Sequence, residues 1–374
     1  MRKIKKLLPF LCAFCLGFTA FVPVGCNDAD NADSGDKDNG TSYTLNFSDK
    51  IKNVILLIGD GMGENHIGNA VTYFGLESPA FFADRNGSIA TCSASHPITD
   101  SAAAATALAT GKKVNNRNIA RYDGNDLTQI SDLAKAAGKK VGVVTTDHLS
   151  GATPAAFSGN ADDRGDSDAI AATQAISGIG LFMAEAESGF TDYEAYYPLF
   201  AANGYACAKS ETELLGKADE EKLVAYLPEV RSEYNAGNEE DYQLKEMAKF
   251  AVEFLENENG FFLMIESAHI DKYSHSNKLS SALCEVRSLF DTVEYLYDYV
   301  ADGETALLIT ADHETGALSK AANATDISNA LYGSTGHTAN DVPFFIKNCE
   351  FTYHEASSPQ NTVVFEICKE LLGI

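Results

Sequence analysis

The sequence contains few positive charges. Its 374 residues include 28 lysine and arginine residues against 53 aspartate and glutamate residues, which gives a formal net charge of −25 at pH 7. A chain this acidic is repelled by phosphate backbones and anionic membranes, so binding of nucleic acid through a basic surface is excluded. Hydrophobic residues make up 45% and charged residues 22%, which is ordinary for a folded protein and excludes a disordered one.

The cysteines lack the close pairs that a metal-binding knuckle needs. After Cys26 they stand singly, at Cys92, Cys207, Cys284, Cys349 and Cys368. Zinc held by cysteine is therefore not expected, and because the number is odd at least one thiol should stay free. The pairing of the others is open. The sequence also lacks a GxSxG motif, which argues against a serine-hydrolase triad.

The N-terminal residues predict export. A positively charged start from Arg2 to Lys6 precedes an apolar run from Leu7 to Val24, so residues 1–25 are interpreted as a signal peptide. Cys26 follows a segment similar to a bacterial lipoprotein cleavage site, which predicts a lipid anchor and a periplasmic or cell-surface location. Ordinary cleavage and free secretion are the alternative. Residues 26–45 are acidic and aperiodic and predict a flexible linker, followed by one catalytic domain over 46–374.

Short apolar runs predict a parallel sheet. They span residues 54–58, 141–144, 261–265, 306–309 and 342–346. Runs without alternation are typical of strands buried on both faces, and helical patterns lie between them, for example over 130–137 and 283–300. The fold class predicted is α/β, a doubly wound three-layer α/β/α sandwich with a largely parallel central sheet. Residues 165–245 are interpreted as an insertion of helices and loops that covers the sheet.

Side chains able to bind metals follow four of these runs. They are Asp60, the pair Asp147 and His148, Glu266 with Asp271 and His275, and the pair Asp312 and His313. In such a sheet the carboxyl ends of parallel strands form the ligand-binding edge. Mixed carboxylate and imidazole donors suit zinc better than calcium. A lone aspartate after a strand is usually a helix cap, but that explanation would have to hold at all four strand ends.

Ser101 begins an alanine-rich stretch that predicts a helix as far as Thr110, ended by Gly111. A hydroxyl at a helix N-terminus lies where free N–H groups favour anions. Taken alone, Ser101 is better explained as a simple N-cap, because serine commonly caps alanine-rich helices.

The motifs together resemble the alkaline phosphatase family. The run from Ile98 to Thr106 (ITDSAAAAT) is similar to the active-site signature of that family. The other matching motifs follow in the family's order: Asp60 in IGDGMG, ATPAA at 152–156, Glu266 with Asp271, Lys272 and His275, TADH at 310–313, and GHT at 336–338. The resemblance spans residues 53 to about 347, and the short interval between His313 and His337 resembles a compact bacterial member.

The resemblance implies a role for each matching residue. Ser101 would be the nucleophile and form a phosphoserine. The implied ligands are Asp271, His275 and His337 for one zinc, Asp60, Asp312 and His313 for a second zinc, and Asp60, Thr153 and Glu266 for a magnesium-like third ion. Arg164 would grip the phosphate oxygens, and Lys272 would reach the phosphate through water.

Two departures from the family pattern stand out. Gly151 replaces the usual aspartate or histidine two residues before Thr153, so water, Asp147 or His148 would have to take its place at the third ion. Arg164 is surrounded by acids that compete for its charge, namely Asp162, Asp163 and Asp166.

The resemblance implies small phosphate monoesters as substrates. Three divalent ions would make one pocket positive inside an acidic protein, so such esters should reach the site. Polyanions such as nucleic acids are not expected to bind. A homodimer is the assembly that the resemblance implies, and any membrane contact would be through Cys26. One alternative is a phosphodiesterase or phosphonate hydrolase, although such relatives often carry threonine as nucleophile. A second is a metal-dependent phosphoglycerate mutase, which the signal peptide disfavours. A third is a phosphate-binding surface lipoprotein without turnover.

Overall fold

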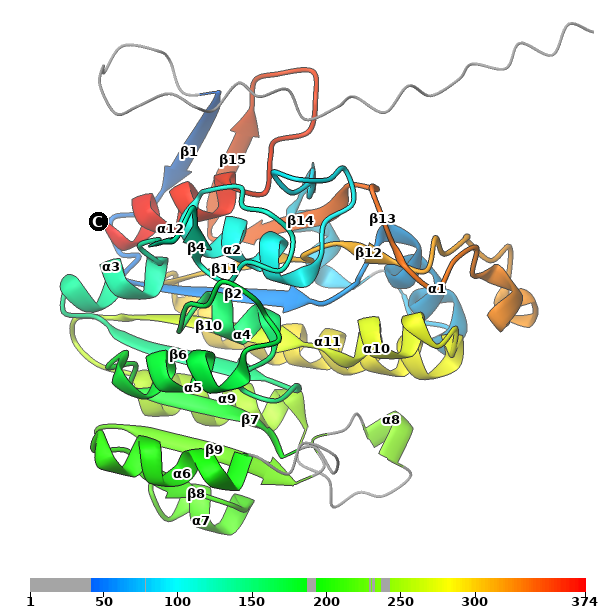
Figure 1. The fold of residues 1–374 in the computed structure, drawn as a ribbon. Helices are drawn as coiled ribbons and strands as arrows, with labels where there is room; N and C mark the ends of the chain where they lie inside the picture. Colours follow the sequence, from blue (N-terminus) through cyan, green and yellow to red (C-terminus); the bar gives the residue numbers. More distant parts are fainter. Residues whose placement is uncertain (1–41, 78, 187–192, 229, 231–232, 237–242) are drawn as a thin grey trace, which may run out of the picture. The chain divides into compact units, whose positions relative to one another are not determined.

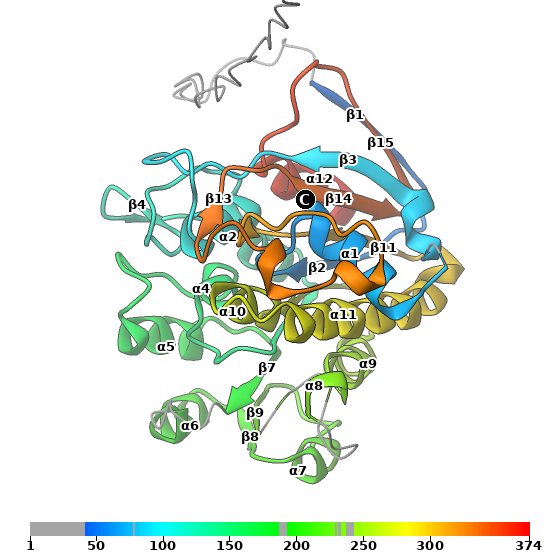
Figure 2. The same ribbon diagram turned by 90° about the vertical axis from the view of Figure 1, so that its right-hand side faces the viewer.

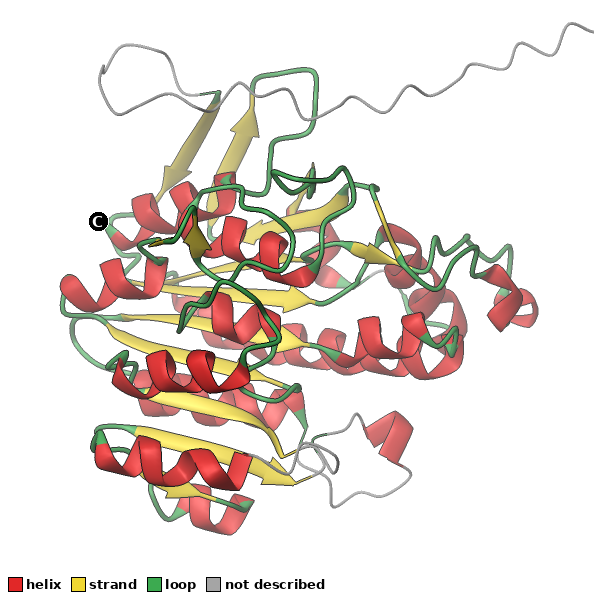
Figure 3. Cartoon of the chain, in the orientation of Figure 1, coloured by secondary structure: helices red, strands yellow, loops and turns green. Residues whose placement is uncertain are grey.

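The computed structural model describes residues 42–77, 79–186, 193–228, 230, 233–236 and 243–374. Over these residues the chain forms a central sheet of nine strands with helices on both faces (Figure 1, Figure 3). The strand order is β3-β14-β11-β2-β10-β6-β7-β9-β8. The strands from β11 to β8 run parallel to their neighbours, whereas β14 is antiparallel to both β11 and β3. The predicted fold class is confirmed.

The strands of the central sheet are short and mostly buried on both faces. Their bounds are β2 (Asn53–Gly59), β3 (Arg85–Ile89), β6 (Lys140–Thr145), β7 (Leu181–Ala186), β8 (Ala206–Ala208), β9 (Leu223–Pro228), β10 (Phe261–Ser267), β11 (Thr305–Thr310) and β14 (Val342–Lys347). All five apolar runs in the sequence are strands. Smaller ladders pair β1 (Tyr43–Phe47) with β15 (Cys349–Tyr353), β4 (Arg121–Tyr122) with β5 (Asn125–Asp126), and β12 (Glu314–Thr315) with β13 (His337–Thr338).

Two groups of helices enclose the sheet, as Figure 2 shows from the side. One group contains α1 (Glu64–Phe74), α9 (Leu244–Leu255), α10 (His269–His275) and α11 (Leu279–Tyr299). The other contains α2 (Ser101–Thr110), α3 (Ile130–Ala136), α4 (Ala152–Ala156), α5 (Ser167–Ile176), α6 (Tyr193–Ala202) and α12 (Val363–Leu372). Shorter helices are α7 (Glu211–Leu215), α8 (Glu233–Ala236), η1 (Ala80–Asp84), η2 (Val300–Asp302), η3 (Ala324–Asp326) and η4 (Asn329–Leu331).

The segment 165–245 extends the sheet, which differs from the expected cover of helices and loops. It contributes β7, β9 and β8, which continue the sheet beyond β6. The runs LFMAEA and LVAYLP are buried like the predicted strands; Glu185 and the surrounding helical patterns hid them in the sequence. Tyr196 and Tyr197 are buried core residues of this segment.

The predicted signal peptide and Cys26 lie outside the described residues, as does most of the predicted linker. Strand β1 begins at Tyr43, so the last residues of the 26–45 span belong to a strand rather than to the linker. Among the described residues, no helix is both long and apolar enough to span a bilayer.

Candidate active site

Ser101 is the first residue of helix α2 and its side chain is buried. The cap of that helix is Asp100, whose side chain accepts a hydrogen bond from the backbone N–H of Ala103 at 3.0 Å. The Ser101 hydroxyl instead lies 3.1 Å from Nε2 of His313. Since Asp100 already satisfies the helix end, capping does not explain Ser101, and its hydroxyl faces the predicted metal ligands.

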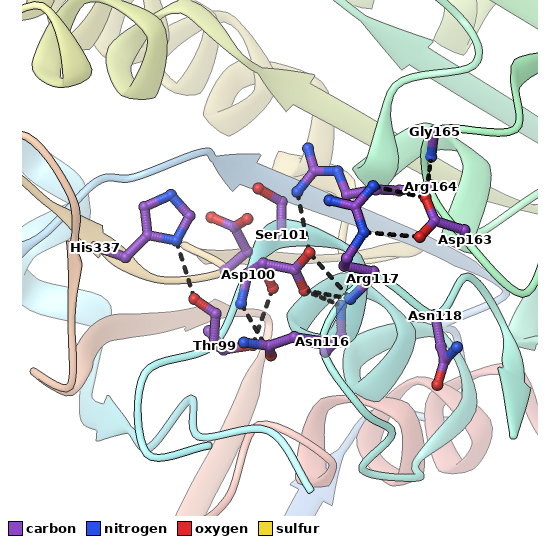
Figure 4. Close-up of polar contacts among 12 residues, drawn as sticks. Thr99, Asp100, Ser101, Asn116, Arg117, Asn118, Asp163, Arg164, Gly165 and His337 are labelled. Carbon is purple, nitrogen blue, oxygen red and sulfur yellow. Dashed lines mark hydrogen bonds and ion pairs between the residues drawn. The ribbon is translucent and has the colours of Figure 1, made fainter. Parts of the chain in front are cut away.

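Asp100 also holds Arg164 near Ser101. Nη1 of Arg164 lies 3.3 Å from Oδ2 of Asp100, and the backbone N–H of Arg117 donates to both oxygens of the same carboxylate. Figure 4 shows the two guanidinium groups beside Asp100 and Ser101. Arg117 adopts a left-handed backbone with φ of 78°. That conformation is unusual for a side-chain-bearing residue, and here it aims the N–H at Asp100.

The acids expected to compete for Arg164 have other partners. Asp163 forms a two-pronged ion pair with Arg117, with distances of 2.7 and 2.6 Å. Asp166 caps helix α5, and Asp162 lies 3.5 Å from Arg121. Among the ion pairs of the described residues, Asp100 is the partner that orients Arg164. This orientation fits the bidentate grip on an anion that the family resemblance implies.

One predicted metal group is assembled from α10 and β13. Asp271, His275 and His337 place ligand atoms within 4.8 Å of one another. The Nε2 atoms of His275 and His337 are 3.1 Å apart, and Oδ2 of Asp271 is 3.2 Å from Nε2 of His275.

The orientation of both imidazoles fits a cation. Nδ1 of His275 lies 2.6 Å from the carbonyl of Thr335, and Nδ1 of His337 lies 2.9 Å from that of Thr99. Because a carbonyl only accepts, each Nδ1 carries the hydrogen and each Nε2 directs a lone pair into the group, as metal-binding histidines do. Without an ion, the hydrogen bond to Asp271 raises the pKa of His275 to about 8, in spite of burial.

A second group lies beside Ser101, where β2 and β11 end. Nε2 of His313 is 3.5 Å from Oδ1 of Asp60 and 3.2 Å from Oδ2 of Asp312. Both carboxylate oxygens are buried and make no hydrogen bond. Burial and neighbouring carboxylates raise the pKa of Asp60, and raise that of Asp312 to about 6. A buried charge needs a partner, and a divalent cation would supply one.

Asp271 links the two groups. Its ligand atoms also lie within 4.8 Å of those of Asp60 and His313, although the sequence places it only with His275 and His337. Burial favours its neutral form, but the hydrogen bond with His275 and the charges of the nearby histidines dominate and lower the pKa of Asp271.

The third predicted group contains only oxygen donors. Glu266 lies near the end of β10 and accepts a hydrogen bond from Thr145, while Thr153 lies in α4. Burial and the charge of Asp147 raise the pKa of Glu266 to about 8. Thr153 Oγ1 is buried with no hydrogen bond of good geometry, although its closeness to Glu266 lowers the pKa of that carboxyl. Such hard oxygens suit magnesium.

The family model described as "Alkaline phosphatase" matches residues 51–182 and 199–365. The chain belongs to the alkaline phosphatase family. Alkaline phosphatase 3 of Bacillus subtilis is 30% identical over 339 residues, which cover 85% of this chain and 71% of that protein. The alkaline phosphatase of Escherichia coli K12 is 31% identical over 335 residues, or 71% of each chain.

Solved structures agree with this assignment. The alkaline phosphatase of the Antarctic bacterium TAB5 superposes with a TM-score of 0.74 at 27% identity, covering 86% of this chain and 98% of that one. A mutant of the same protein, solved with magnesium bound, gives a TM-score of 0.75. Family membership supports a hydrolase of phosphate monoesters.

Lys272 and Gly151 lie beside the oxygen group of this chain. Nζ of Lys272 lies 2.6 Å from Oδ1 of Asp147, so an ion pair holds it at the edge of the oxygen group. Gly151 is the residue that precedes α4 and has no side chain to offer.

Several residues that shape the site were not among the predicted site residues. Thr315 donates to Oδ1 of Asp271 and lies 3.2 Å from Nδ1 of His313, so it joins ligands of both histidine-containing groups. Gly61 has φ of 74°, and a Cβ there would lie 2.9 Å from Asp271 and from Thr315. The glycine pattern of IGDGMG signals such crowding, whereas nothing in the sequence marks Thr315 or Arg117.

The remaining histidines lie outside the metal groups of the described chain. His66 is buried, accepts from the N–H of Gly63 and lies 3.0 Å from the hydroxyl of Ser274. His269 is buried 3.1 Å from Glu185. Cys207, Cys284, Cys349 and Cys368 form no disulfide, as the odd cysteine number predicted for at least one.

Proposed function

We propose that the chain hydrolyses small phosphate monoesters through a phosphoserine at Ser101, with two zinc ions and one magnesium ion. The observation that carries the proposal is the 3.1 Å approach of the Ser101 hydroxyl to His313, between a helix N-terminus and two groups of metal-ligating atoms. The zinc ligands proposed are those that the family resemblance implies, with Asp271 shared in space by both groups. The oxygen group of Asp60, Thr153 and Glu266 would hold magnesium.

The residues divide the reaction between them. Ser101 Oγ attacks phosphorus in line with the ester oxygen; the P–O bond to the alcohol breaks, and the alcohol leaves with a proton. Water then attacks the phosphoserine, which releases inorganic phosphate and restores the hydroxyl. Arg164, oriented by Asp100, donates to two non-bridging oxygens throughout. When bound, the zinc ions would lower the pKa of the attacking hydroxyl and stabilise the leaving oxygen.

The test compares p-nitrophenyl phosphate with bis-p-nitrophenyl phosphate at pH 8–10, with zinc and magnesium present and after EDTA treatment. The monoester should be preferred, EDTA should abolish activity, and Ser101→Ala should lower kcat by about 10³-fold or more. Preference for the diester would make the chain a phosphodiesterase. A parent protein inactive with every metal would point to a phosphate-binding protein, and full activity of Ser101→Ala would remove the nucleophile.

A further inference from the structure

The space beside residue 151 is filled by another carboxylate. A Cβ built on Gly151 would lie 2.8 Å from Oδ2 of Asp147 and 2.9 Å from the carbonyl oxygen of His148. Approaches below 3.0 Å are essentially never made by a real Cβ, so a side chain at 151 and the present position of Asp147 exclude each other. The glycine therefore makes room for Asp147.

Asp147 is held in this place by bonds on both sides. Its Oδ1 accepts from Nζ of Lys272 at 2.6 Å and from the N–H of His148 at 2.8 Å. Its own N–H donates at 2.8 Å to the hydroxyl of Thr145, and that hydroxyl donates to Glu266. The side chain is only 17% exposed. Asp147 is thus fixed next to Glu266, and after burial its charge is the main cause of the raised pKa of Glu266.

His148 does not occupy the same place. Its Nδ1 lies 3.0 Å from the hydroxyl of Ser150, and its Nε2 is 3.8 Å from Asp147. Of the two side chains that the sequence offers in compensation for Gly151, only Asp147 fills the position where a residue-151 side chain would begin.

The oxygen group contains buried polar atoms without hydrogen-bond partners. Thr153 Oγ1 and Asp60 Oδ1 are both buried and make no hydrogen bond of good geometry. Thr153 follows Gly151 in the chain by two residues, within the first turn of α4. Polar atoms buried without partners are costly, and a hard divalent ion with its waters would satisfy them together with Asp147 and Glu266.

We propose that Asp147 supplies the third cation site with the carboxylate that position 151 lacks, facing the hydration shell of a magnesium ion. The proposal rests on the third site of the proposed function. The ion pair with Lys272 would then reduce the affinity of the site for magnesium, because the ammonium group competes with the cation for the same carboxylate. Removal of Asp147 should therefore weaken magnesium binding, and removal of Lys272 should strengthen it.

The test is calorimetric titration of the zinc-loaded, magnesium-free protein with MgCl₂. Asp147→Asn should raise the Kd for magnesium by about tenfold or more, the range known for residues that support metal ligands. Lys272→Met should lower that Kd several-fold. Asp162→Asn removes the same charge from a side chain that is 72% exposed, so it is the matched control and should leave the Kd unchanged.

Opposite signs for the two variants separate the proposal from a structural ion pair. If the pair only anchors the loop, Asp147→Asn and Lys272→Met weaken magnesium binding together, and the proposal is wrong. It is also wrong if Asp147→Asn leaves the Kd unchanged. Should Asp147→Asn fail to fold, Lys272→Met decides: tighter binding supports the proposal and unchanged or weaker binding overturns it.

No substrate enters this experiment, so its outcome is independent of hydrolysis. A parent protein that binds no magnesium would overturn both the third site and the role of Asp147, and would leave the Ser101 test intact. A parent that binds magnesium through Asp147 yet hydrolyses no ester would overturn the proposed activity alone.

Discussion

The two sides of the candidate active site offer different atoms. The histidine side contains His275, His313 and His337, the oxygen side contains Thr153 and Glu266, and Asp60 is proposed as a ligand on both sides. Imidazole nitrogens suit zinc, whereas carboxylate and hydroxyl oxygens suit magnesium. On the proposed function, donor chemistry rather than position on the sheet would decide which ion each side binds. We therefore expect a substitution on one side to lower the binding of the metal proposed for that side and to leave the other metal bound.

The largest effect is expected on the histidine side from Asp271→Asn. The ligand atom of Asp271 lies within 4.8 Å of those of both proposed zinc groups. Its loss should therefore lower zinc content and reduce kcat/KM by about 10³-fold, equivalent to several kcal/mol of transition-state stabilisation. Zinc and magnesium are measured by elemental analysis and activity with p-nitrophenyl phosphate. The matched change on the oxygen side, Glu266→Gln, should lose magnesium and keep zinc. Loss of the same metal in both variants would break the comparison.

A smaller effect is expected from Thr315→Val, which sharpens the same comparison. Thr315 binds no predicted ion itself but donates to Asp271 and pairs with Nδ1 of His313. Valine keeps the shape and removes both bonds, so zinc affinity should fall about 10- to 100-fold. Magnesium affinity should be unchanged, since Thr315 touches no residue of the oxygen side in the described hydrogen bonds. Competition with a zinc chelator measures the first quantity and calorimetry the second.

Several residues of the candidate site could be predicted from the sequence alone. Asp60, Glu266 and Asp312 stand at or shortly after the ends of apolar runs. In a parallel sheet that position places them at the ligand-binding edge before any coordinates exist. Ser101 follows equally from an alanine-rich helix with a glycine end. Local pattern sufficed for these residues because each is placed by the element to which it is attached.

Contacts between distant segments could not be predicted. Thr315 meets Asp271 across the interval between α10 and β12, and Arg117 reaches Asp100 only through a left-handed backbone. Neither arrangement has a periodicity that a sequence displays. Strands β7 and β9 were missed for a different reason, since short apolar runs beside helical patterns are ambiguous without their neighbours. The sharing of Asp271 between two groups likewise depends on packing.

The smallest effect concerns stability rather than metal, and arises where His66 in α1 supports α10 through Ser274. Burial lowers the pKa of His66 from 6.5 to about 4. Between these values the unfolded chain binds a proton and the folded chain does not, so stability falls as pH decreases from 6.5 to 4. His66→Gln should flatten this fall by up to about 3 kcal/mol, measured by urea unfolding in EDTA. His96→Gln, the same change at an exposed position, should keep the parent slope; an equally steep fall in His66→Gln would assign the acid sensitivity to other groups.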